Sequence, residues 1–330
     1  MFTDIFMNEI IVNFVLVIAG IFMLLKGADY LISLAIYVAD RTGVPKFIVG
    51  VTLIAFGTSI PELAVTLLSS FQGKNELAIA SILGSNISNI LLIIGLGAFL
   101  YPLRITRAVA TRDIPFSLIS IIIFSVVVFD KVFTDATTNM LLRSDGLILL
   151  ISFAIFIYYV AFTHKKHFED NRQGKKKVNL MPKAAKGLFG LLLLILGGTL
   201  VVESAVLLAK YAGVTERVIG LTVVAIGTSL PELVTMLIAL KRGEAELGLG
   251  NIVGSNIFNL LFVLGISVSL SPVTDVGRIE FDFVVLLLAT ILLIASLYLG
   301  KRNKVDKLEG GLFLILFIVY LLLLVFVPQI

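Results

Sequence analysis

Long apolar runs alternate with short polar breaks along almost the whole chain of 330 residues. Most runs hold about 20 residues or more, which is enough for a helix to cross the roughly 30 Å hydrocarbon core of a bilayer. Gly, Pro and charged residues separate neighbouring runs, as expected for short connections. The pattern predicts ten membrane-spanning helices, near residues 9–36, 46–71, 77–100, 114–130, 145–164, 187–210, 217–240, 246–270, 281–300 and 309–328.

The composition supports a membrane protein. Hydrophobic residues make up 58% of the chain and the mean hydropathy is +1.08, whereas soluble domains hold about 45–50% apolar residues. We expect an all-α integral membrane protein, because a helix satisfies its own backbone hydrogen bonds in lipid. The chain has no cysteine, so disulfides and thiolate metal sites are excluded. Both histidines, His164 and His167, lie in one polar loop.

Basic residues are distributed unevenly between alternate connections. The loops after the first, third, fifth, seventh and ninth segments hold 19 Lys and Arg residues, and the opposite loops hold six. Loops rich in Lys and Arg stay in the cytoplasm. We therefore expect a multi-pass protein of the cell membrane with both termini outside and the loop 165–186 in the cytoplasm. Because the net charge of +4 comes from these short loops, we expect the lipid bilayer as a partner and no nucleic acid.

The two halves of the chain carry an internal repeat. A shift of 170 residues aligns 50–95 with 220–265 without a gap, and 21 of the 46 positions are identical. Each half holds five segments, so the second half enters the membrane from the opposite side, and the repeats are inverted. Sites in such folds lie near the midplane, where the repeats meet. The predicted domains are a first inverted repeat over 1–164 (repeated region about 47–95), a cytoplasmic linker loop over 165–186, and a second inverted repeat over 187–330 (repeated region about 217–265).

Two polar motifs recur inside apolar segments. Gly-Thr-Ser-x-Pro-Glu ends at Glu62 and at Glu232, and Gly-Ser-Asn-x-x-Asn begins at Gly84 and at Gly254. A carboxylate at the centre of a bilayer costs about 3 kcal/mol or more. The prolines of the first motif interrupt their helices, because proline has no N–H, and such breaks need a protein or water-filled environment. We expect helices 2, 3, 7 and 8 to be discontinuous, with Gly84 and Gly254 loosening helices 3 and 8.

The motifs offer only oxygen ligands. Thr58 and Glu62 are four residues apart, as are Ser85 and Asn89, so each pair shares one helix face. All-oxygen sites suit hard cations such as Ca²⁺, Na⁺ and Mg²⁺, and two carboxylates neutralise one divalent cation. The alternative is that these groups only join helices through hydrogen bonds. The candidate ligands are Glu62, Glu232, Asn89, Asn259, Thr58, Thr228, Ser85, Ser255 and the freed backbone carbonyls of Ala55 and Ala225.

With these motifs, the sequence resembles the cation/Ca²⁺ antiporter superfamily, and within it the prokaryotic sodium/calcium exchanger proteins. The resemblance covers the whole chain. It implies a secondary active antiporter that exchanges Na⁺ for Ca²⁺ by alternating access, with Glu62 and Glu232 as central Ca²⁺ ligands that also take part in Na⁺ binding. It further implies that Asn89 supplies a central amide and that flanking Na⁺ sites are formed by Thr58, Ser59, Thr228, Ser229, Ser85, Ser255 and the carbonyls of Ala55 and Ala225.

One position departs from the resemblance. Archaeal exchangers and K⁺-dependent relatives have an aspartate where this chain has Asn259. We therefore expect a K⁺-independent exchanger, with the Na⁺ stoichiometry left open. The alternative is an H⁺/Ca²⁺ antiporter of the same fold, with the glutamates as proton carriers. The transported ions Ca²⁺ and Na⁺ are the expected small-molecule partners, no cofactor is expected, and a monomer is sufficient for transport.

Three charged residues lie within the predicted segments 1 and 6 and outside the repeated motifs. Lys26 and Asp29 are three residues apart, and we expect an ion pair or side chains that reach the cytoplasmic end. Glu203 has no counterpart in the first half. The resemblance places all three near gating, because segments 1 and 6 slide across the core in that family. An enzyme is not expected, because no His lies in the interior of a span, His164 being the last residue of the fifth, and no His-Glu-x-x-His motif occurs. A channel is the other class to be tested. Saturable counterflow in vesicles would support a carrier, whereas unsaturable conductance would indicate a channel.

Overall fold

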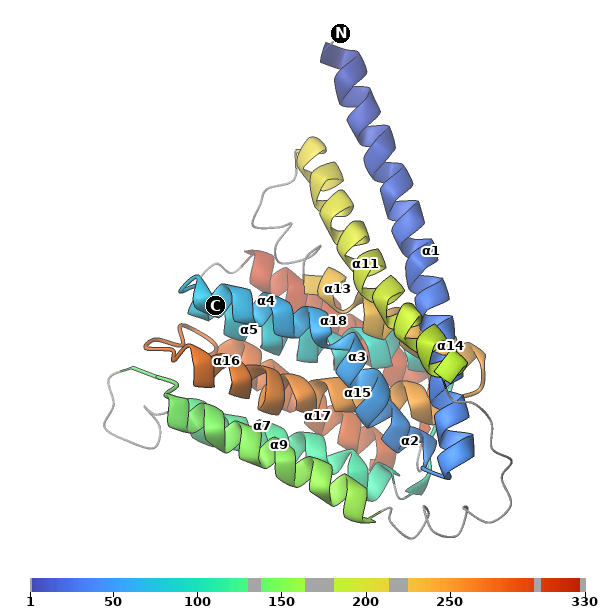
Figure 1. The fold of residues 1–330 in the computed structure, drawn as a ribbon. Helices are drawn as coiled ribbons and strands as arrows, with labels where there is room; N and C mark the ends of the chain where they lie inside the picture. The colour runs from blue at the N-terminus through green and yellow to red at the C-terminus, as the bar shows by residue number, and fades with distance from the viewer. Residues whose placement is uncertain are drawn as a thin grey trace.

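The computed structural model describes residues 2–107, 109–129, 138–163, 181–213, 225–299 and 304–326, and most of them are helical (Figure 1). The first half contains α1 (Phe2–Thr42), α2 (Lys46–Val49), η1 (Gly50–Ile54), α3 (Ala55–Thr58), α4 (Ile60–Phe71), α5 (Asn75–Ile87), η2 (Ser88–Ile94), α6 (Gly95–Leu100), β1 (Leu103–Arg104), η3 (Val109–Asp113), α7 (Pro115–Val128) and α9 (Arg143–Thr163). The second half contains α11 (Met181–Tyr211), α13 (Ala225–Thr228), α14 (Leu230–Lys241), α15 (Ala245–Ile257), η5 (Phe258–Val263), α16 (Leu264–Leu270), α17 (Glu280–Leu299), β2 (Lys304–Val305) and α18 (Lys307–Phe326).

The helices are those of a multi-pass membrane protein. In the described part of the chain, eight are long and apolar enough to cross a bilayer, and a ninth candidate is a pair of helices bent by 45° between Thr58 and Ile60. Large apolar side chains cover the outside of the bundle, such as Phe14 and Phe22 of α1, which are 62% and 61% exposed. Apolar exposure on this scale marks a surface that meets lipid. Residues 217–224 of the predicted segment 217–240 lie outside the described residues.

The structure corrects the expectation that the third and eighth predicted spans, 77–100 and 246–270, are discontinuous. Each crosses as one continuous helix, Ala78–Leu100 and Ala245–Leu270, and the irregular part is a π-helical stretch that begins at Ser88 and at Phe258. Gly254 instead allows close packing, because a Cβ there would lie 2.6 Å from the backbone of Val51. A single glycine inside a helix costs only about 1 kcal/mol, which tertiary packing readily overcomes.

The end of the linker loop was also predicted too late in the chain. Helix α11 begins at Met181, inside the predicted loop 165–186, and residues 164–180 lie outside the described residues. Pro182 follows the first helical residue, and proline is well tolerated in the first turn of a helix. The amines of Lys183 and Lys186 lie 4.3 Å from the ring centres of Tyr37 and Tyr30 on α1, so the first turns of α11 are held by packing.

Contacts between the two halves come in matched pairs. α6 packs on α18 through Gly95 and Gly310, and α16 packs on α9 through Gly265 and Gly146. The short strands repeat this arrangement, since Leu103 pairs with Val305 and Leu141 pairs with Val273. The two contacts of each kind are related by the repeat: Gly265 lies 170 residues after Gly95, and Val273 lies 170 residues after Leu103. The halves are therefore interwoven, with the last helix of each packed on the other.

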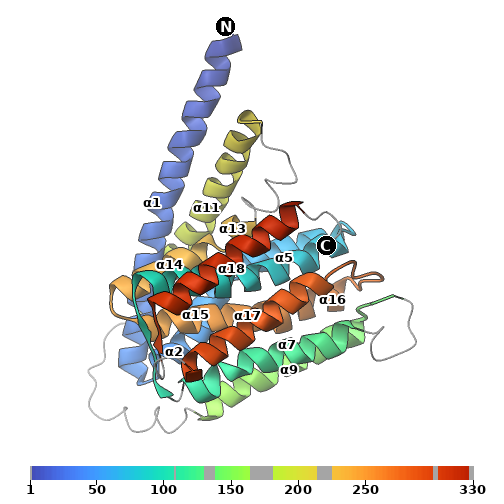
Figure 2. The same ribbon diagram turned by 180° about the vertical axis from the view of Figure 1, so that it is seen from behind.

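Helices α1 and α11 form a tilted pair that extends beyond the other helices in both views (Figures 1 and 2). The pair is antiparallel and crosses at two glycine contacts, Gly20 with Gly197 and Gly27 with Gly190. A Cβ on any of these four residues would lie 2.6–2.8 Å from a carbonyl oxygen of the other helix. Small residues let membrane helices approach this closely, so van der Waals contact between the two backbones holds the pair together.

Adjacent glycines of α11 provide a matched test of this contact. A Cβ on Gly197 would lie 2.8 Å from the Gly20 oxygen, whereas the nearest atom to a Cβ on Gly198 is 3.6 Å away. We expect Gly197→Ala to lower the melting temperature of the purified protein by roughly 2–6 °C, because overpacking costs about 1–3 kcal/mol. Gly198→Ala should leave it unchanged or raise it, because alanine favours helix. Equal melting temperatures for the two variants, measured by scanning fluorimetry, would contradict the close packing.

Candidate functional site

Two helix breaks with the same geometry define the centre of the molecule. Ser59 precedes α4 and Ser229 precedes α14, and both residues have φ −88° and ψ 7°. Pro61 and Pro231 occupy the second position of the new helices, where the missing N–H is tolerated because it has no partner within the helix. The repeated sequence thus produces a repeated break, and it places Glu62 and Glu232 in the first turn after it.

Both glutamates are buried. Glu62 and Glu232 are each 1% exposed, and the Oε2 atom of each has no hydrogen-bond partner. The two carboxylates are close enough to repel each other directly. The positive end of the helix dipole at the start of α4 and α14 favours a carboxylate in the first turn, by about 0.3–1 kcal/mol. That is less than the burial of two like charges requires, so the pair needs a positive ligand or protons.

The hydroxyls of Ser59 and Ser229 are free to bind a ligand. A serine before a helix normally accepts a hydrogen bond from the second or third N–H of that helix. Here the second residue is proline, which has no N–H to donate. Neither serine caps its helix, and both hydroxyls are buried without a partner.

Hydroxyl groups of the two halves meet in pairs related by the 170-residue shift. The Oγ1 of Thr58 lies 3.5 Å from the Oγ of Ser255, and the Oγ of Ser85 lies 3.4 Å from the Oγ1 of Thr228. Ser255 also donates to Oε1 of Glu232 at 3.4 Å. The breaks of one half therefore lie against the Gly-Ser-Asn motif of the other, and the candidate oxygens of both halves share one buried region.

The predicted amides lie in the same region. Asn89 and Asn259 are 1% and 0% exposed, and the Oδ1 atoms of both have no partner. Each side-chain N–H₂ group donates across to the other half, to Oδ1 of Asn256 and of Asn86 respectively. Each residue therefore presents an uncommitted oxygen. Of the sequence-predicted ligands, the carboxylate, hydroxyl and amide oxygens gather around the two breaks.

The backbone carbonyl of Ala55 differs from the prediction. It was expected to be freed by the break, but it accepts a hydrogen bond from the N–H of Ser59 at 3.0 Å. The turn at Ser59 closes the preceding helix with this bond, and only the second lone pair of the oxygen is left for a ligand. Ala225 is the first residue of α13, and its side chain lies outside the described residues.

Sequence reasoning missed several buried polar groups beside the site. Asn251 accepts a hydrogen bond from Thr58 at 3.0 Å and keeps an unpartnered N–H₂ group, and the hydroxyls of Thr66 and Thr235 have no partner. These positions differ between the two halves, so a search restricted to repeated residues passed over them. Helical spacing would have found Thr66, which follows Glu62 by four residues.

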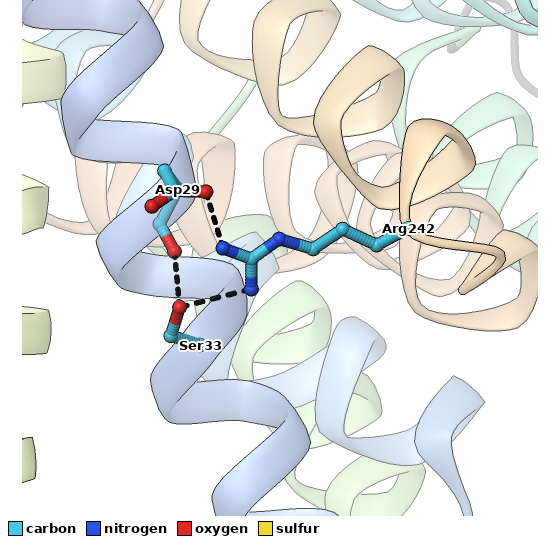
Figure 3. A network of polar contacts seen from close by, with 3 residues as sticks. All are labelled: Asp29, Ser33 and Arg242. Atoms are coloured by element: carbon cyan, nitrogen blue, oxygen red, sulfur yellow. Dashed lines mark hydrogen bonds and ion pairs between the residues drawn. The ribbon is translucent and has the colours of Figure 1, made fainter.

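Asp29 pairs with a different residue than expected. Its carboxylate bonds to Arg242, at the end of α14, and Arg242 also donates to Ser33 Oγ at 2.9 Å (Figure 3). Lys26 lies 5.7 Å from the ring centre of Phe22 within the same helix. The ion pair of Lys26 with Asp29 is therefore not formed, because Arg242 at the end of α14 binds the Asp29 carboxylate. The alternative, that these side chains reach the cytoplasmic end, stays a prediction. Glu203 is exposed on α11.

Comparison with known proteins shows the family of the chain. The sequence profile of the family described as sodium/calcium exchanger protein matches residues 12–162 and 186–326. The sodium/calcium exchanger MaX1 of Methanosarcina acetivorans is 30% identical over 350 residues, which cover 96% of this chain and 100% of the relative. The inner membrane protein YrbG of Escherichia coli is 34% identical over 288 residues, which cover 84% of this chain and 86% of the relative.

A solved structure has the same fold. It is that of the sodium-calcium exchanger NCX_Mj soaked with 10 mM Na⁺ and 10 mM Sr²⁺, and the match covers 95% of this chain and 98% of that chain with a TM-score of 0.80 and 28% sequence identity. The similarity extends over nearly the full length of both chains.

The uncapped serines give a test of the site geometry. In buffer without Na⁺ or Ca²⁺, Ser59→Ala should leave the melting temperature unchanged or raise it, because the hydroxyl makes no protein hydrogen bond. Ser70→Ala is the control, because it breaks the 2.7 Å bond to Ser267 and should cost about 1 kcal/mol. A loss of about 1 kcal/mol for Ser59→Ala would indicate an ordinary helix cap and would contradict the free hydroxyl.

Proposed function

The chain belongs to the sodium/calcium exchanger family, and from this premise we propose that it is a K⁺-independent antiporter that exchanges Na⁺ for Ca²⁺ across the cell membrane by alternating access. Family membership makes it a membrane transporter for cations. The observation that carries the finer proposal is the pair of buried carboxylates, Glu62 and Glu232, in motifs whose neutral oxygens are also buried and uncommitted.

The central position suits one Ca²⁺ ion. Ca²⁺ takes six to eight oxygen ligands, with flexible geometry. Glu62 and Glu232 supply the two negative charges that neutralise it, and the free Oδ1 atoms of Asn89 and Asn259 supply neutral oxygens. Neutralisation is what allows a site of two like charges to persist in a medium of low dielectric constant.

Neutral oxygens on either side suit Na⁺. Thr58 with Ser255, and Thr228 with Ser85, form hydroxyl pairs between the halves, and the hydroxyls of Ser59 and Ser229 are uncommitted. Together with the carbonyls of Ala55 and Ala225, they form flanking Na⁺ sites in our proposal. Na⁺ and Ca²⁺ compete for the glutamates, so occupation by either ion neutralises the site and permits the conformational change.

The same proposal includes ten spans arranged as two inverted repeats, 1–164 and 187–330, joined by a cytoplasmic loop. It is supported by the matched contacts between the halves, such as Leu103 with Val305 and Leu141 with Val273. The excess of basic residues in alternate loops supports termini on the outside. Inverted repeats with broken helices at the site are the architecture expected for alternating access.

The buried serine hydroxyls favour Na⁺ over H⁺ as the driving ion. Protons would need only the glutamates, and they would leave the buried hydroxyls of Ser59 and Ser229 without a function or a partner. The absence of a charge at Asn259 supports K⁺ independence, because fewer anionic ligands hold fewer cations. Both points favour Na⁺ alone as the coupling ion.

Uptake of ⁴⁵Ca²⁺ into proteoliposomes tests the proposed Na⁺-driven, K⁺-independent exchange directly. We expect rapid saturable uptake into Na⁺-loaded vesicles, no uptake driven by a pH gradient, and no change when K⁺ is replaced by choline. Glu62→Gln and Glu232→Gln should each lower uptake at least about tenfold, because each removes a charged ligand. Glu280→Gln, on the exposed first residue of α17, is the matched control and should retain it.

Other outcomes separate the alternatives. Uptake driven by the pH gradient and not by Na⁺ would identify an H⁺/Ca²⁺ antiporter, and unsaturable conductance would identify a channel. Full uptake by both glutamine variants would show that the ion site lies elsewhere.

Alternating access gives the contact between α1 and α14 a second role. Arg242 holds Asp29 and Ser33 only while α1 lies at its present height along the core (Figure 3). The pair is partly exposed, with side chains 30% and 43% accessible, and exposed ion pairs contribute about 1 kcal/mol or less. A sliding motion of α1 and α11 must break this contact, so the pair favours one conformation slightly.

Removal of this pair should affect the rate more than ion binding. We expect Arg242→Ala to raise the maximal Na⁺-driven uptake roughly two- to fivefold without a change in the half-saturating Ca²⁺ concentration. Asp29→Ala should have the same effect, and the double variant should match either single variant. Lys26→Ala is the control, because Lys26 contacts a ring of its own helix. Additive effects, or a slower exchange, would contradict this role for the pair.

A further inference from the structure

Four buried asparagines link the two halves through their side chains. Asn86 and Asn89 come from α5 and η2, and Asn256 and Asn259 come from α15 and η5. All four are at most 4% exposed. They belong to the repeated Gly-Ser-Asn-x-x-Asn motif, but only the last asparagine of each motif was assigned to the ion site.

The hydrogen bonds among them run across the pseudo-twofold axis in matched pairs. Asn86 Nδ2 donates to the backbone oxygen of Asn256 at 3.2 Å, and Asn256 Nδ2 donates to that of Asn86 at 3.4 Å. Asn89 Nδ2 donates to Asn256 Oδ1 at 2.9 Å, and Asn259 Nδ2 donates to Asn86 Oδ1 at 3.1 Å. Each bond of one half has a counterpart in the other.

This pattern fixes which atom of each outer amide is free. Asn86 directs its N–H₂ group at a backbone carbonyl, and this orientation places its Oδ1 against Asn259. The N–H₂ group of Asn259 must therefore turn towards Asn86, and its oxygen turns away. The same reasoning applies to Asn256 and Asn89. The two oxygens turned away are those that have no partner, Asn89 Oδ1 and Asn259 Oδ1.

The orientation matters because an amide is nearly symmetric in shape and opposite in charge at its two ends. Its oxygen attracts a cation, whereas its N–H₂ group repels one. A free asparagine beside the glutamates would gain by turning its N–H₂ group towards a carboxylate. Such a flip would both satisfy the carboxylate and remove a cation ligand, so some group has to prevent it.

We infer that Asn86 and Asn256 are positioning residues, which hold the amides of the opposite half so that their oxygens face the cation. This inference rests on the proposed central Ca²⁺ site and assigns no direct ion contact to either residue. If these bonds only joined helices, no particular amide orientation would be needed. All four bonds here lead to one orientation, in which the oxygens of Asn89 and Asn259 are left free.

The hydrogen bond between Asn86 and Asn259 also explains why position 259 holds an amide and not a carboxylate. The Oδ1 of Asn86 accepts a hydrogen bond from Asn259, so a carboxylate there would place two acceptor oxygens against each other. Asn86 would then have to turn its N–H₂ group towards position 259 and release the backbone of Asn256. Asn86 and Asn259 therefore form a matched pair in this chain.

A set of double-variant cycles tests the inference, with Ca²⁺ affinity measured by calorimetry on the purified full-length protein. We expect Asn86→Ala and Asn256→Ala each to weaken Ca²⁺ binding about three- to tenfold, the effect of one buried hydrogen bond. The effect of Asn86→Ala should vanish in an Asn259→Ala background, and that of Asn256→Ala should vanish in an Asn89→Ala background. The pairs within one half, Asn86 with Asn89 and Asn256 with Asn259, are matched controls whose effects should multiply.

Equal coupling in all four pairs, or unchanged affinity in Asn86→Ala and Asn256→Ala, would overturn the positioning role. Serine variants carry the same test if an alanine variant is not monodisperse, because a serine hydroxyl bonds within its own helix and does not reach the opposite half. A wild-type protein that binds no Ca²⁺ would overturn the proposed function together with this inference. Ca²⁺ binding that is lost in Glu62→Gln, with multiplicative effects in every asparagine pair, would overturn the inference alone.

Discussion

The burial of two carboxylates inside the helix bundle is the constraint on which the rest of the structure depends. Glu62 and Glu232 are almost fully inaccessible, and within the described ranges neither forms an ion pair. Two like charges in this environment are stable only when something neutralises them. In the proposed mechanism a bound cation neutralises the pair, so the affinity for cations and the conformational change depend on the same two groups.

The surrounding backbone is arranged to keep oxygens uncommitted. Proline after the Ser59 and Ser229 breaks removes the N–H that would otherwise capture the serine hydroxyl. The asparagines between the halves commit their N–H₂ groups to each other and leave two oxygens free. In an ordinary core such unpartnered groups would cost about 1–3 kcal/mol each. We propose that here they serve as the neutral ligands of a cation site.

Much of the fold and most of the site could be predicted from the sequence because both depend on simple patterns. Span length is set by bilayer thickness, and the 170-residue repeat identified Glu62 and Glu232 together. The errors have a physical cause in common. The partner of Asp29 is Arg242, 213 residues away, and the packing role of Gly254 depends on Val51 in the other half. Asn251 was missed because its hydrogen bond to Thr58 has no repeat counterpart. Contacts between halves do not follow from the local sequence.

Anomalous diffraction from crystals of the protein soaked in Sr²⁺, with the Na⁺ of the soak varied, would test the central claim most directly. Sr²⁺ is a larger analogue of Ca²⁺ with the same preference for oxygen ligands. The account predicts a strong peak bonded to both Glu62 and Glu232, with the oxygens of Asn89 and Asn259 turned towards it, that weakens as Na⁺ rises. A peak elsewhere with none between the two glutamates, or one bonded to a single glutamate at full occupancy, would contradict it.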